Sequence, residues 1–147
     1  MQRNEFASEE ELKSYLIALV IEYCSKMNEI EEDIYKKRKL VETEALFKEY
    51  KERYTPLIQT YATDKKRVHN YHRSYGKPTY YDGMENPLKI SVTFINKNRA
   101  EIYFARAPTR WRDFDLSFVV LRKKDVWRID GVKTHRGCLD KWSASIL

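Results

Sequence analysis

Arginine and tryptophan side chains cluster in the C-terminal half of the chain. Arg110 and Arg112 flank Trp111, and Arg106 stands four residues before the first of them. Arginine and tryptophan are among the side chains most enriched at the energetic centres of protein interfaces. They also suit nucleic acid, because tryptophan stacks on bases and arginine pairs with phosphates. The chemistry offered by this cluster is therefore recognition of another macromolecule.

A second basic group, Lys123, Lys124 and Arg128, follows at a predicted turn between two strands. Residues 1–60 hold 10 basic and 13 acidic side chains, a net −3, whereas residues 61–147 hold 18 and 9, a net +9. A basic surface attracts an acidic partner over long range. The aromatic spacing of an RNA-binding platform is absent, so the sequence favours an acidic protein over a nucleic acid. A solvated turn would carry the same lysines, and that alternative stays open.

The segment at residues 66–88 combines turn residues with tyrosines. Gly76-Lys77-Pro78 and Asp82-Gly83 are typical of turns, and a connection of this length is usually functional or disordered. Its aromatic density favours a segment that packs on the body of the protein. We treat Tyr75, Tyr80 and Tyr81 as secondary candidates for partner contact.

Residues suited to catalysis or metal binding are few. His69 and His72 are three apart and could share one helical face, but no HExxH pattern and no cysteine cluster accompanies them. A general base could come from these histidines or from Asp64 and Asp82, each of which also reads as an ordinary polar residue of a loop or helix end. No glycine-rich phosphate loop is present, so we expect no metal and no cofactor.

Cysteine usage and hydropathy indicate the compartment. Cys24 and Cys138 do not make a disulfide framework, and we expect both to be reduced thiols. The N-terminal residues contain no apolar signal region, and the longest apolar stretch, about residues 15–24, includes Glu22 and is too short to span a bilayer. We therefore expect a cytoplasmic protein without membrane association.

Helical periodicity dominates the first part of the chain. Ser8 begins a capping pattern that Glu11 completes, and apolar residues then recur at helical spacing from Leu12 to Ile30. This predicts a helix from about residue 9 to 35, followed by a second over about 42–54. Thr55-Pro56 suits the start of a separate short helix that ends near residue 65.

From residue 88 the apolar period becomes two. Four alternating runs separated by short polar turns predict an antiparallel meander with one strongly apolar face. Arg106, at a strand end, is the only ionisable member of that face. Helices followed by strands indicate an α+β fold, with the helices covering one face of the sheet. We expect one domain over 1–147, with helices at about 9–65, the connecting loop at 66–88, the four-stranded sheet at 88–134 and a tail at 135–147.

The last predicted hairpin carries a family resemblance. Residues 118–130 read FVVLRKKDVWRID, an apolar strand, a basic turn and then Trp-x-Ile-Asp. With the preceding helices and loop, this resembles the nuclear transport factor 2-like fold, in which a curved sheet wraps a long helix into a cone. Residues 61–67 and 74–80, together with the closing Lys141-Trp142, resemble its immunity-protein branch, over roughly residues 41–147. Members of that branch are bacterial proteins encoded beside polymorphic toxins, and each binds and neutralises its cognate toxin.

The resemblance implies a non-catalytic immunity protein whose partner is a toxin with an acidic surface. The alternative is a small-molecule-binding protein or an isomerase- or dehydratase-type enzyme, which the same cone also hosts. Such enzymes place a carboxylate or histidine on the inner face, and no predicted inner-face residue is of that kind. A homodimer through the outer face of the sheet is also open, because Val119, Leu121 and Val132 are predicted on that face.

Overall fold

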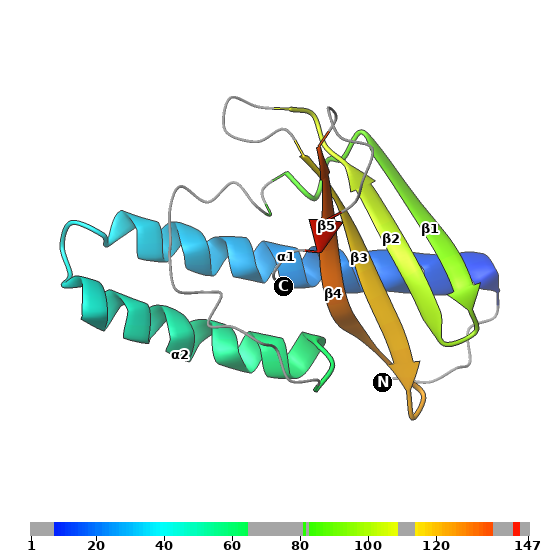
Figure 1. Cartoon of the computed structure of the whole chain (residues 1–147), viewed down its shortest axis with the longest axis horizontal. Helices are drawn as coiled ribbons and strands as arrows, with labels where there is room; N and C mark the ends of the chain where they lie inside the picture. The colour runs from blue at the N-terminus through cyan, green and yellow to red at the C-terminus, as the bar shows by residue number, and fades with distance from the viewer. Residues whose placement is uncertain (1–7, 65–80, 82, 109–113, 137–142, 145–147) are drawn as a thin grey trace.

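Two helices precede an antiparallel sheet in the computed structural model, which describes residues 8–64, 81, 83–108, 114–136 and 143–144 (Figure 1). The helices are α1 (Glu9–Lys36) and α2 (Thr43–Tyr61). The strands lie across the sheet in chain order, and they are β1 (Lys89–Asn96), β2 (Arg99–Ala105), β3 (Phe114–Lys123), β4 (Val126–Arg136) and β5 (Ser143–Ala144). The predicted α+β class with an antiparallel sheet is confirmed. The two-residue β5, which pairs with β4, was not predicted.

Helix α1 has two packing partners along its length. Its N-terminal half lies against the sheet, and its C-terminal half runs beyond the sheet and packs antiparallel to α2 (Figure 1). The Ser8 hydroxyl accepts a hydrogen bond from the Glu11 amide at 3.1 Å, which confirms the predicted cap. One stripe of the helix is buried throughout, and its residues are Leu16, Val20, Tyr23, Cys24, Met27, Ile30 and Ile34.

Helix α2 is longer than the sequence predicts. Thr55 and Pro56 lie inside it, so the expected break between two short helices is wrong. An interior proline destabilises a helix by about 3 kcal/mol because it lacks an N–H group. The helical turn after Pro56 buries Leu57 and Tyr61. Burial of a large apolar side chain stabilises the fold by about 1.5–3 kcal/mol, so the two together offset the cost of the proline. The Thr55 hydroxyl also donates to the Lys51 carbonyl at 2.7 Å.

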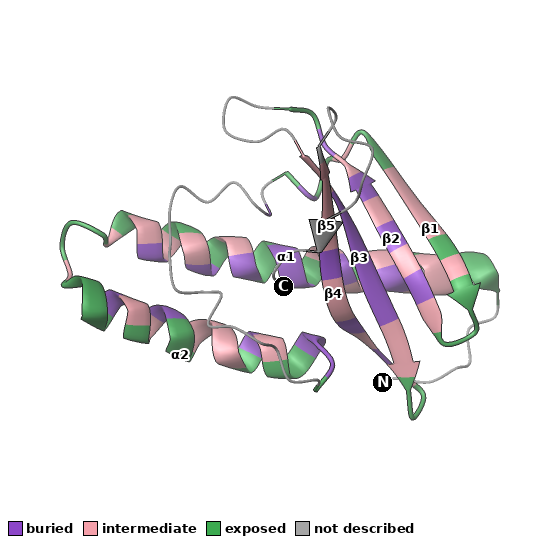
Figure 2. Cartoon of the chain, viewed as in Figure 1, coloured by how far each residue is buried: buried purple, intermediate pink, exposed green. Residues whose placement is uncertain are grey.

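The core lies between α1 and the inner face of the sheet. Residues 116–120, the middle of strand β3, are buried on both faces of the sheet (Figure 2). Ile102, Phe104, Leu116, Phe118 and Ile129 are fully buried on the predicted inner face. The Phe104 and Phe118 rings meet edge to face, with centroids 6.0 Å apart. The strand phase read from the sequence is therefore confirmed up to residue 129.

A bulge in β4 changes that phase. Val120 pairs with Ile129 and Val119 pairs with Gly131, so Asp130 is an extra residue in the ladder. Beyond it the alternation is reversed, and Val132 lies opposite Phe118 and is 3% exposed in the core. The expectation that Val132 belongs to the outer face is therefore wrong. Two of the three residues proposed for an outer-face dimer remain on that side.

Phe118 provides a direct test of the core. We expect Phe118→Ala to lower the free energy of unfolding by about 3–5 kcal/mol, because it removes a fully buried ring. Leu40→Ala is the matched control, since Leu40 is 83% exposed and its truncation should change stability by less than about 0.5 kcal/mol. Urea denaturation measures both. Equal effects of the two substitutions would show that the strand phase is misassigned.

Candidate partner-binding site

The turn between β3 and β4 presents the basic group predicted from the sequence. Lys124 and Asp125 form its two central positions, with φ angles of 52° and 64°. Two left-handed residues in a two-residue loop suit the twist of a hairpin, although glycine or asparagine usually fills them. A residue other than glycine in this left-handed conformation lowers the stability of the folded chain by roughly 1–2 kcal/mol. Lys123 and Lys124 are exposed, and neither is paired with a carboxylate in the described part of the chain.

Arg128 holds the end of α2 against this hairpin. Its guanidinium donates to the Gln59 carbonyl at 3.0 Å and to the Thr60 carbonyl at 2.8 Å. These carbonyls belong to the last turn of α2, which has no further helical partners for them, and the arginine charge also complements the helix dipole there. Arg128 is therefore a structural cap as well as a source of positive charge.

Thr63 fastens the same helix end to the bulge of β4. Its amide donates to the Ile129 carbonyl at 2.9 Å, and its hydroxyl donates to an Asp130 carboxylate oxygen at 2.8 Å. Thr63 itself is 5% exposed. The extra residue of the bulge thus supplies the acceptor that anchors α2. The position of the helix end relative to the basic turn is set by these contacts.

A cleft of about 730 Å³ lies between the end of α2 and the β3–β4 hairpin. Apolar side chains contribute to its lining, and they are Ile58, Ala62, Leu121 and Val126. Three basic side chains also line it, Lys123, Lys124 and Arg128, against one carboxylate, that of Asp64. An apolar recess with a basic rim suits an apolar side chain that is flanked by carboxylates.

Two residues predicted to contact a partner are buried instead. Arg106 is 5% exposed, and its guanidinium carbon lies 5.3 Å from the Phe114 ring centroid. Tyr81 is 3% exposed and packs edge to face on Tyr23, with ring centroids 5.8 Å apart. The folded chain covers both side chains, so neither is exposed for contact with a partner. The placement of Arg106 on the inner face is as predicted.

Several other predicted residues lie outside the described part of the chain. They are His69, His72, Tyr75, Tyr80, Asp82, Arg110, Trp111 and Arg112. The strands that flank the arginine–tryptophan loop are nevertheless described, and they end at Ala105 and begin at Phe114. Strand β3 runs from there over ten residues to Lys123, which is roughly 30 Å. In the sequence, residues 110–112 precede the first residue of β3, whereas Lys123 is its last residue.

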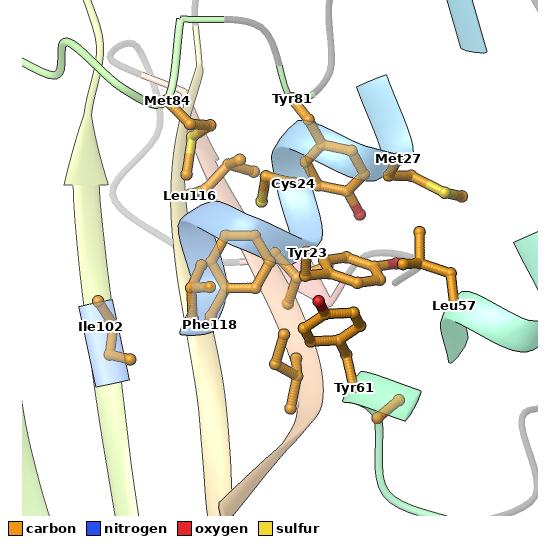
Figure 3. Close-up of a cluster of buried hydrophobic side chains, with 14 of the residues drawn as sticks. Tyr23, Cys24, Met27, Leu57, Tyr61, Tyr81, Met84, Ile102, Leu116 and Phe118 are labelled. Carbon is orange, nitrogen blue, oxygen red and sulfur yellow. The ribbon is translucent and has the colours of Figure 1, made fainter. Parts of the chain in front are cut away.

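The interior around α1 is lined by aromatic rings and one thiol (Figure 3). The rings of Tyr61 and Tyr81 pack on Tyr23 of α1, and Phe118 of β3 packs on Tyr81. Cys24 is a free, fully buried cysteine. Burial raises the pKa of its thiol well above the ordinary value, and the positive charge of Arg106 opposes this only in part. A neutral buried thiol is a poor nucleophile, so Cys24 acts as a packing residue.

Among the described residues that are buried, none is an aspartate, a glutamate or a histidine. The buried polar residues are Thr63, Arg106 and Ser117. A general base for chemistry inside the cone would therefore have to come from a half-buried or exposed residue, or from outside the described segments. No group of three metal-ligating side chains forms within those segments, and no helix there is long and apolar enough to cross a membrane.

One half-buried carboxylate was missed by the sequence reasoning. Glu31 on α1 accepts a hydrogen bond from the Tyr50 hydroxyl of α2 at 3.0 Å. Burial between the helices raises the pKa of Glu31 to about 7, although the Tyr50 hydrogen bond opposes this. Glu31 lies four residues after Met27 and next to Ile30, so it borders the apolar stripe of α1. This position was the sequence signal that its side chain would be partly buried. Glu31 does not line the cleft, so we assign it to the helix interface.

Residues 16–145 match the family model of the NTF2 fold immunity proteins. The chain belongs to this family. The match extends from α1 to β5 and confirms the resemblance read from the hairpin motif. No curated protein and no solved structure matches the chain at a significant level. This NTF2 fold immunity protein therefore has to be understood from its own residues.

Glu31 makes the stability of this immunity protein depend on pH. Its pKa of about 7 in the folded state lies above the ordinary value, so the folded protein holds the proton that the unfolded chain releases in the intervening pH range. The contribution of Glu31 to stability is therefore greatest at low pH and is lost as pH rises through about 7. Glu31→Gln keeps the polar contact without the charge, and we expect it to gain stability relative to the parent between about pH 5 and pH 8.

Chemical denaturation at several pH values measures this difference. Glu32→Gln is the control, because Glu32 is an exposed carboxylate on the neighbouring position of α1. The difference in stability between the Glu32→Gln variant and the parent should not change over the same pH range. A level difference for Glu31→Gln as well would contradict the assignment of a raised pKa to Glu31.

Proposed function

We propose that this chain is a non-catalytic immunity protein that binds and neutralises a cognate bacterial toxin in the cytoplasm. The observation that carries the proposal is the cleft beside the β3–β4 turn, where the exposed Lys123 and Lys124 line a recess together with apolar side chains. Membership of the immunity family supports a toxin as the partner. Bound at this surface, the protein would block the toxin's active site or the approach of its substrate.

The physical features of the cleft suit protein recognition. Lys123 and Lys124 are exposed at a two-residue turn that directly connects the paired strands β3 and β4. Positive charges at such a surface speed the encounter with an acidic partner, and salt screens this effect. The apolar part, which includes Leu121 and Val126, can bury a partner side chain and slow dissociation. The arginine–tryptophan loop at 110–112 remains a second proposed contact.

The charge of the turn can be tested with the purified toxin. We expect Lys123→Glu with Lys124→Glu to lower the association rate, with an effect that shrinks as ionic strength rises. Lys48→Glu with Lys51→Glu is the matched control, since these exposed lysines on α2 carry the same charge change away from the cleft. Surface plasmon resonance at low and high salt measures both rates.

Equal rates for the turn variant and the control would exclude the cleft as the contact. In that case, slower association of Arg110→Glu with Arg112→Glu, or faster dissociation of Trp111→Ala, would place the contact in the other basic group. If none of these variants binds less well, the tyrosine-rich segment with Tyr75 and Tyr80 becomes the next surface to test.

The absence of catalysis has its own test. His69, His72, Asp64 and Asp82 are the residues that the sequence offered as general bases. Asp64 lines the proposed binding cleft and is left unchanged in the test. We expect joint replacement of His69, His72 and Asp82 by Asn or Gln to leave protection intact. Survival of cells that produce the toxin together with each immunity variant measures protection. Loss of protection by a variant that stays folded, as judged by circular dichroism and thermal unfolding, would favour an enzyme.

A further inference from the structure

Strand β1 is an edge strand without the usual protection against pairing. Among the described strands it pairs only with β2, and in Figure 1 it forms the free side of the sheet. An edge strand leaves a row of backbone N–H and C=O groups available to another strand. Proteins normally block this with proline, central charges or a bulge. Strand β1, KISVTFIN, has no proline, its charged residue is the first one, and its irregularity comes only after Phe94.

The side chains along this edge are incompletely covered. Ile90, Val92 and Phe94 pack against the core from the inner face but remain partly exposed. Leu88 and Ile95, at the two ends of the strand, are 70% and 52% exposed. Exposed apolar residues that gather along one open edge indicate an interaction surface rather than scattered surface hydrophobics.

The outer face of the sheet is better covered. Glu101 of β2 and Lys133 of β4 form an ion pair across β3, with their charged atoms 3.3 Å apart. Val119 and Ser117 lie between these two strands and are each 5% exposed. With Val132 turned into the core, this face offers little apolar surface. An outer-face dimer therefore has less support from the structure than association through the β1 edge.

We infer that two copies of the chain pair antiparallel through β1, about a twofold axis at Val92. This register is self-complementary. It places Val92 opposite Val92 of the other copy. Ile90 of each copy lies opposite Phe94 of the other, and all of these residues are on the inner face. On the outer face it places Ser91 opposite Thr93. Lys89 falls opposite Ile95, so the two lysines do not meet, and a second copy adds no like-charge contact along the edge.

Charges placed at the outer-face positions test both the interface and its register. In Ser91→Lys with Thr93→Lys, each new lysine would face a lysine of the other copy. We expect this variant to raise the dimer Kd about tenfold or more. In Ser91→Glu with Thr93→Lys, the facing charges are opposite, and we expect the dimer to persist. Both variants place the same lysine opposite Glu101 of β2, so the monomer is matched at that position.

Sedimentation velocity on the full chain, over a concentration series that ends at the solubility limit, measures the association. Circular dichroism and thermal unfolding check that each variant is folded. A parent protein that stays monomeric throughout would overturn the inference. A dimer that both variants weaken equally, or that neither changes, would also overturn it, because the proposed register requires them to differ. Toxin binding is a separate readout, so this result does not depend on the proposed function.

Discussion

The apolar stripe of α1 is the constraint on which the rest of the structure depends. Helix α1 is 28 residues long and carries this stripe from Leu16 to Ile34, and among the described elements no single one covers all of it. The sheet covers the first half and α2 covers the second (Figure 1). The two covers must therefore meet beside the helix. They meet where the end of α2 joins β4 through Thr63 and Arg128.

This junction explains why the candidate site lies where it does. The bulge at Asp130 reverses the inward and outward alternation of side chains along β4. Its carboxylate accepts the hydrogen bond from the Thr63 hydroxyl. Arg128, two residues earlier, satisfies the last carbonyls of α2. The space left between the anchored helix end and the projecting turn is the cleft. The site is thus a product of how the two covers of α1 are joined, and its basic rim comes from the turn that extends past the junction.

The sequence predicted the features that repeat and missed those that occur once. The stripe of α1 and the alternation in β1 to β3 extend over several periods, so each position supports the others. The bulge depends on one residue, and its available signal was Gly131, a glycine inside a strand, which often marks a bulge. Pro56 was read as a boundary because the burial of Leu57 and Tyr61 that carries the helix past it is a tertiary effect.

The left-handed turn at Lys124 and Asp125 has a consequence for engineering and for evolution. Asn-Gly would relieve the backbone strain of both positions and would be the first choice of anyone seeking a more stable hairpin. The same replacement would delete a lysine from the rim of the proposed binding cleft. If Lys124 contacts the partner as proposed, selection for stability and selection for binding act on it in opposite directions, a local form of the trade-off between stability and activity. A thermostabilised version of this protein is best sought away from the turn.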